Sequence, residues 1–295
     1  MKSSIYLFFA CLLLTATGCP QKNTDKKFKA AAGLPPVAGL AAAIAGDRME
    51  IITVLPEGKT PHDFTPRNET IRKTAGAQIF FTTGMPFENK IASFMKQRAK
   101  ICDVTAGIER IAFQDGRNND HHHHDGCSHD DHDPHVWLSP ANAIRIAENI
   151  CAEFVAADPD GKEYYEKNLA ALKEKLSALD QQISRKLHPF AGRPFFVYHP
   201  AFGYFADAYN LKQRAIELNG REASAADLAQ IIKEAKAANI HTVFVQEQFN
   251  PRNANALAKE INGVAVPLDP LASNLLQNFE KIADALASGF EGNKK

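Results

Sequence analysis

One run of seven apolar side chains, spaced every three or four residues, constrains the fold of this chain more than any other feature. The members are Tyr165, Leu169, Leu172, Leu176, Leu179, Ile183 and Leu187. This spacing is typical of an amphipathic helix with one apolar face. It predicts a single helix from about Lys162 to His188, roughly 40 Å long at about 1.5 Å per residue. Pro189, Gly192 and Pro194 should end it.

Short apolar runs alternate with helical stretches on both sides of this helix, as is typical of parallel sheets covered by helices. Before it, we expect strands at 49–55, 78–82 and about 111–113, and helices at 88–100 and 140–157. After it, we expect strands at 195–198, 242–245 and 264–268, and helices after Pro200 and at 225–236, 253–261 and 274–287. Ser224 with Asp227 three residues later is typical of a helix capping box. The predicted fold class is α/β, with lobes at 35–158 and 191–295 joined by one long rigid helix at 159–190.

The N-terminal residues have the pattern of a targeting segment. Lys2 precedes an apolar stretch, Ile5 to Leu14, that is too short to span a bilayer as a mature helix. Residues 1–18 are therefore predicted to be a signal peptide. The small residues before Cys19 resemble a bacterial lipobox, which implies cleavage before Cys19 and lipidation of its thiol. An ordinary secretory signal is the alternative. Residues 19–34 would be a flexible tether, and the chain a periplasmic or cell-surface lipoprotein.

Charge and cysteine content limit the possible partners and crosslinks. The chain has 34 basic and 34 acidic side chains, and this zero net charge gives no support for a nucleic-acid partner. The predicted mature chain has three cysteines, so at least one thiol is unpaired. A disulfide between Cys102 and Cys151 is possible from sequence, and Cys127 could be a soft metal ligand.

Seven of the eleven histidines lie between Asp120 and Pro140. The first part, 120–133, has no hydrophobic periodicity and is predicted to be a solvated His-rich loop. A purification tag or a polar loop without a role are the simpler interpretations. Imidazole and carboxylate are the usual ligands of zinc, so we expect weak secondary metal binding in this loop. Its candidate ligands are His121, His122, His123, His124, His129 and His132.

Four further polar residues follow or flank predicted strands at the edge where open α/β sheets bind ligands. They are His62, His135, His199 and Asp269. Each alone would more often be a helix cap or a satisfied polar group. Together, three imidazoles and one carboxylate make a complete tetrahedral ligand set for zinc.

Four motifs resemble the metal-binding solute receptors of bacterial ABC importers for zinc and manganese. They are GKTPHDFTP at 58–66, DPHVWLSP at 133–140, YHPAFGYF at 198–205 and PLDPL at 267–271. The resemblance covers about residues 35–290. It implies metal held in the cleft between the lobes, delivery to a membrane permease, and a monomer. Thr60 and Ser139 stand where many members have an acidic residue, but neither change removes a ligand.

The leading hypothesis is a non-enzymatic receptor for Zn²⁺. A manganese or mixed zinc and manganese receptor is the first alternative, although a nitrogen-rich site favours zinc. A zinc hydrolase is a second, but the chain has no His-Glu-x-x-His motif and Glu247 is the one candidate base. A third is a surface adhesin or storage protein that only buffers metal.

Overall fold

The computed structural model describes residues 27–113, 132–217, 223–249 and 252–292. The predicted signal peptide, Cys19, Cys127 and five loop histidines (His121, His122, His123, His124 and His129) lie outside these residues. Lipidation of Cys19 and metal binding by Cys127 and these histidines therefore remain predictions. Across the described residues, no helix combines the length and apolar character needed to cross a membrane.

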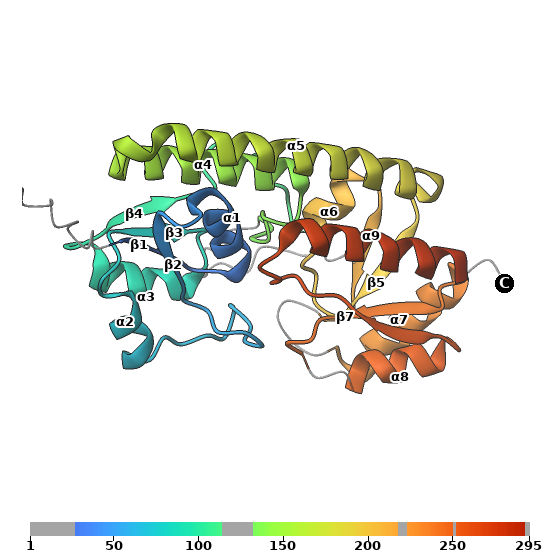
Figure 1. Cartoon of the computed structure of the whole chain (residues 1–295). Helices are drawn as coiled ribbons and strands as arrows, with labels where there is room; N and C mark the ends of the chain where they lie inside the picture. The colour runs from blue at the N-terminus through green and yellow to red at the C-terminus, as the bar shows by residue number, and fades with distance from the viewer. Residues whose placement is uncertain (1–26, 114–131, 218–222, 250–251, 293–295) are drawn as a thin grey trace, which may run out of the picture.

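Each lobe is built on a four-stranded parallel sheet (Figure 1). The N-terminal sheet has the order β2-β1-β3-β4, with β1 at Phe28–Ala32, β2 at Met49–Thr53, β3 at Ile79–Thr82 and β4 at Lys100–Asp103. The C-terminal sheet has the order β6-β5-β7-β8, with β5 at Pro194–Val197, β6 at Lys212–Ala215, β7 at Thr242–Val245 and β8 at Val264–Pro267. Both sheets thus share one topology, and the predicted fold class is confirmed.

Helices cover the sheets and bridge the lobes. The N-terminal lobe has α1 at Pro35–Ala45, α2 at Asn68–Thr74, α3 at Pro86–Met95 and α4 at Pro140–Ala157. The C-terminal lobe has α6 at Gly203–Ala208, α7 at Ala225–Ala237, α8 at Arg252–Glu260 and α9 at Leu275–Gly292. Short 3-10 turns, Pro159–Gly161 and His188–Phe190, flank the long helix α5 at Lys162–Leu187. In Figure 1, α5 runs along one side of the molecule over both lobes.

The apolar face of α5 packs against both lobes. Tyr165, Leu172, Leu176, Ile183 and Leu187 are buried, and α5 packs on α1 and α4 of one lobe and α9 of the other. A fully buried leucine contributes about 2 kcal/mol to stability. At the start of α5, the Tyr165 hydroxyl donates to Asp158 at 2.6 Å, and Arg48 donates two further bonds to the same carboxylate. The helix is therefore fixed to the N-terminal lobe before it reaches the second one.

Two predictions fail at the N-terminal sheet. The tether predicted over 19–34 is too long, because β1 begins at Phe28 and lies between β2 and β3. Its sequence, FKAAA, lacks the β-branched residues that usually mark a strand. The strand expected near 111–113 is also wrong, since Ala112 forms only an isolated bridge with His132. The fourth strand of the sheet is β4, which begins at Lys100. The helix predicted over 88–100 ends at Met95, so it leaves room for this strand.

Other local predictions are confirmed. Helix α4 spans Pro140–Ala157, with Ser139 accepting a bond from the Asn142 N–H, and Ser224 and Asp227 form the expected capping box. Strand β6 was not predicted, because its sequence KQRA has no apolar run and it lies at a sheet edge. Cys102 and Cys151 are both buried free thiols, so no disulfide joins them.

Candidate metal centre

Three histidines from separate parts of the chain meet between the lobes. His62 lies in the loop between β2 and α2, His135 lies just before α4, and His199 follows β5. Their Nε2 atoms are 3.3 Å apart for His62 and His135, 3.1 Å for His62 and His199, and 3.3 Å for His135 and His199. Within the described residues, these three make a group of donor atoms all within 4.8 Å of one another.

These separations match the spacing of ligands around one small cation. Zinc binds imidazole nitrogen at about 2.0–2.1 Å, and a tetrahedral arrangement then puts neighbouring ligand atoms roughly 3.3 Å apart. All three nitrogens therefore lie at the right distances to share a single metal ion.

Two buried carboxylates fix how the rings of His135 and His199 present their nitrogens. The Nδ1 of His135 lies 2.8 Å from Asp133 Oδ1, and the Nδ1 of His199 lies 3.0 Å from Glu217 Oε2. A neutral imidazole that donates from Nδ1 carries a lone pair at Nε2. Two such lone pairs facing each other at 3.3 Å cannot hydrogen-bond, but both can bind a cation between them.

Neighbouring groups hold the same two histidines in place. His135 is 2% exposed, and its ring meets Trp137 edge-on with centroids 5.5 Å apart. The Trp137 indole N–H donates to the carbonyl of Pro270 in the other lobe at 2.7 Å. His199 is buried, its backbone N–H donates to Gln246 Oε1 at 3.1 Å, and its ring stacks on Phe249 with centroids 5.0 Å apart. Burial lowers the pKa of His199, against the opposing effect of its bond with Glu217.

His62 has a different environment. The residue is exposed, and within the described part of the chain its polar contacts are Thr60 Oγ1, which accepts from the His62 backbone N–H at 3.3 Å, and the Nε2 atoms of the other two imidazoles. Its ring is nevertheless largely removed from solvent where it meets those imidazoles. This desolvation, together with the repulsion from His135 and His199 when protonated, lowers the pKa of His62 to about 3. His62 is therefore neutral and able to bind metal over the physiological pH range.

Asp269, the fourth predicted ligand, lies in the loop after β8 and is partly buried. Its Oδ1 accepts from the Leu271 N–H at 2.8 Å and from Gln248 Nε2 at 3.1 Å. Asp269 does not belong to the close group of three histidines in the described chain. It is adjacent to Pro270, whose carbonyl bonds Trp137, so it lies at the same lobe boundary. Its role as a ligand stays a prediction.

Sequence reasoning missed the residues that hold these histidines: Asp133 and Glu217, which contact the imidazoles, and Gln246, which bonds the backbone of His199. Asp133 stands two residues before His135, a signal that could have been used. Glu217 follows β6 and Gln246 follows β7, so both occupy strand-end positions, but β6 itself was not predicted. Gly203 in α6 also matters, because a Cβ there would lie 2.2 Å from Asp133 Oδ2. By contrast, Glu247, the candidate base of a hydrolase, is exposed.

Residues 31–289 match the family described as ZnuA, zinc-uptake complex component A periplasmic. The chain belongs to this family. A crystal structure of ZnuA superposes with a TM-score of 0.81 at 31% identity, covering 89% of this chain and 99% of that one. A ZnuA deletion mutant with zinc bound superposes with a TM-score of 0.80, also at 31% identity, covering 89% of this chain and 98% of that one.

Curated relatives of this ZnuA-family chain include lipoproteins. The zinc-binding lipoprotein AdcA of Streptococcus pneumoniae is 31% identical, over 100% of this chain and 60% of AdcA. The chain thus spans about 60% of the length of AdcA. The metal ABC transporter substrate-binding lipoprotein SsaB of Streptococcus sanguinis is 28% identical, over 96% of this chain and 97% of its own length.

Proposed function

We propose that this chain is an extracytoplasmic receptor that binds Zn²⁺ and delivers it to the membrane permease of an ABC importer. The observation that carries the proposal is the pair of Nε2 lone pairs on His135 and His199, aimed at each other at 3.3 Å and fixed by carboxylates. Family membership and the zinc named in its relatives support the same function.

The ligands of the tight site would be His62, His135, His199 and Asp269. Three nitrogen ligands favour zinc over manganese, which prefers more oxygen ligands and a higher coordination number. Asp133 and Glu217 would make the metal-bound imidazoles more basic and hold their orientation. Four protein ligands would close the coordination shell, so the proposed role is binding and delivery without catalysis.

Export and membrane attachment belong to the same proposal. The lipobox-like residues before Cys19 and the lipoprotein names of the relatives support a chain that acts outside the cytoplasm, anchored through a lipid on Cys19. The receptor would act as a monomer. The histidines of 120–133 would add weak zinc sites that pass metal to the adjacent His135.

Metal analysis and calorimetry test the function directly. The purified chain should bind one zinc ion tightly, and zinc should displace manganese from that site. His199→Ala should lose the tight site while circular dichroism shows an intact fold. If the wild-type chain bound manganese more tightly than zinc, manganese would be the cargo and the zinc assignment would be wrong. Unchanged zinc affinity in the variant would refute the assignment of the ligands.

A further inference from the structure

Residues 67–100 carry a concentration of positive charge that the site does not use. This stretch has seven basic side chains and two acidic ones in a chain of zero net charge. All seven are exposed: Arg67, Arg72, Lys73, Lys90, Lys96, Arg98 and Lys100. Of the two acidic residues, Glu88 is buried and accepts backbone N–H bonds from residues 83–85, so it does not offset the surface charge.

Few of these cations are neutralised within the described residues. Lys73 pairs with Glu69 at 3.3 Å and Lys100 pairs with Glu153 at 2.5 Å. Lys90, Lys96 and Arg98 have no ion pair in that part of the chain. The face formed by α2, α3 and the turn that follows α3, which we term the α2–α3 face, therefore carries several positive charges without an ion-pair partner among the described residues.

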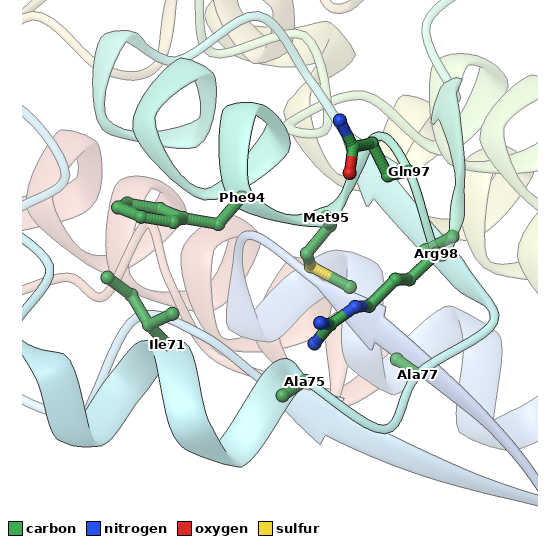
Figure 2. A pocket seen from close by; sticks show the side chains of 8 residues that line it. Ile71, Ala75, Ala77, Phe94, Met95, Gln97 and Arg98 are labelled. Carbon is green, nitrogen blue, oxygen red and sulfur yellow. The ribbon is translucent and has the colours of Figure 1, made fainter.

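The same face has a small apolar pocket between the two helices, with a volume of about 230 Å³. Figure 2 shows Phe94 of α3 and Ile71 of α2 on one side of it, with Met95 lying between Phe94 and Arg98. Phe94 is 57% exposed, although burying a phenylalanine side chain is worth about 2 kcal/mol or more. An exposed aromatic residue beside a pocket that is also lined by Arg98 offers an apolar and a cationic contact at the same place.

We propose that the α2–α3 face docks a protein segment with an apolar side chain flanked by carboxylates, presented by the extracytoplasmic surface of the permease. This inference rests on the proposed receptor function. The apolar side chain would fill the pocket beside Phe94, and the carboxylates would pair with Arg98 and Lys96. Complementary charge accelerates encounter, while the buried apolar contact supplies affinity. The pocket is concave, which suits a protruding side chain better than the flat surface of a bilayer.

The position of the α2–α3 face connects docking to the metal site. Helix α2 begins at Asn68, directly after the loop that carries His62, the exposed member of the three histidines. A partner bound to α2 therefore contacts the helix that directly follows the loop carrying His62.

Two variants separate docking from metal binding: Phe94→Ser and Arg98→Glu. Their controls are Val264→Ser, at a position 58% exposed in the other lobe, and Lys175→Glu on the exposed side of α5. Each purified full-length chain is titrated with zinc, and radioactive zinc uptake is measured in cells where the chain is the sole receptor. We expect unchanged zinc affinity in all four, with uptake at limiting zinc lowered about tenfold in the first two only.

The outcomes distinguish this inference from the receptor function. No zinc uptake with the wild-type chain would overturn the receptor function and the docking proposal together. Normal uptake with both Phe94→Ser and Arg98→Glu would overturn docking at this face alone. A photocrosslinker placed at position 94 should label the tagged permease. The alternative is a membrane contact, tested with the Cys19→Ser chain and phosphatidylglycerol vesicles. If this chain binds the vesicles, and adding Phe94→Ser or Arg98→Glu abolishes the binding, the α2–α3 face contacts the membrane and the proposal of a protein partner is wrong.

Discussion

His135 and His199 differ from His62 in how the protein holds them. The first two are 2% and 6% exposed, and each has a carboxylate on its Nδ1. His62 is exposed and lies in a loop whose Gly58 has a φ of +72° with open space around it. The proposed site thus combines two candidate ligands whose rings are already fixed with one candidate ligand that solvent can reach. A preorganised pair lowers the entropy that binding must overcome, whereas an accessible ligand gives the metal a way in and out.

The largest effect should come from removing a fixed ligand. Structural zinc sites bind with about 10–16 kcal/mol in total, so one of four ligands contributes roughly 3 kcal/mol, or at least a hundredfold in affinity. His135→Ala should weaken zinc binding by at least that factor, as measured by competition with a chelator. The fold should survive, because each lobe keeps its own sheet. A loss of less than about tenfold would contradict the assignment of His135 as a fixed ligand.

His62→Ala should weaken zinc binding less, by about tenfold to a hundredfold, since water can occupy an exposed coordination position. Most of that loss should appear as faster zinc dissociation, with little change in the association rate. Stopped-flow measurement with a fluorescent chelator reads both rates. If the affinity fell as far as in His135→Ala, the distinction between fixed and accessible ligands would not hold.

Removing a carboxylate should loosen a fixed histidine without removing it. Asp133→Asn and Glu217→Gln keep the size of each side chain, and outer partners of metal-bound histidines are typically worth about 10–100-fold in affinity. We expect about tenfold weaker zinc binding in each, with an altered visible spectrum of the cobalt-loaded chain. Gln97→Glu, a change of the same size on an exposed residue, serves as the control. Wild-type affinity in both carboxylate variants would mean that the rings are held by packing alone.

Acid should destabilise the metal-free fold through His62. Its pKa is lowered to about 3 in the folded chain, compared with about 6.5 when unfolded, so between these values only the unfolded chain takes up the proton. The free energy of unfolding should therefore fall as the pH falls from about 6.5 toward 3. Urea unfolding at several pH values should show a shallower fall in His62→Ala than in the wild-type chain. Equal slopes would contradict the lowered pKa.

The smallest effect on the tight site should come from deleting residues 120–131. Ordering a His-rich segment around metal costs conformational entropy, so its sites should be weaker than the preorganised one. Calorimetry on the deletion should lose the weak zinc sites and keep the tight site within a few-fold. Zinc binding to the weak sites of the wild-type chain should decrease as the pH falls through about 6.5, because imidazole becomes protonated there. Loss of the tight site on deletion would show that the loop supplies a primary ligand.

The sequence by itself determined the local features of this protein. The spacing of Tyr165 to Leu187 defined α5, and Ser139 with Pro140 defined the start of α4, because helix periodicity and caps depend on neighbours in the chain. His62, His135 and His199 were identified from their positions beside strands, and the structure brings their Nε2 atoms together.

Only the tertiary structure decided which groups orient those histidines and which strand lies at the sheet centre. Glu217 follows β6, and β6 and the Ala-rich β1 are recognisable only through the strands they pair with. Asp133 contacts His135 two residues along the chain, but its carboxylate also lies so close to Gly203 of the other lobe that a Cβ there would clash with it. Such contacts depend on distance in space across a folded interface, which neither side-chain periodicity nor motif spacing encodes.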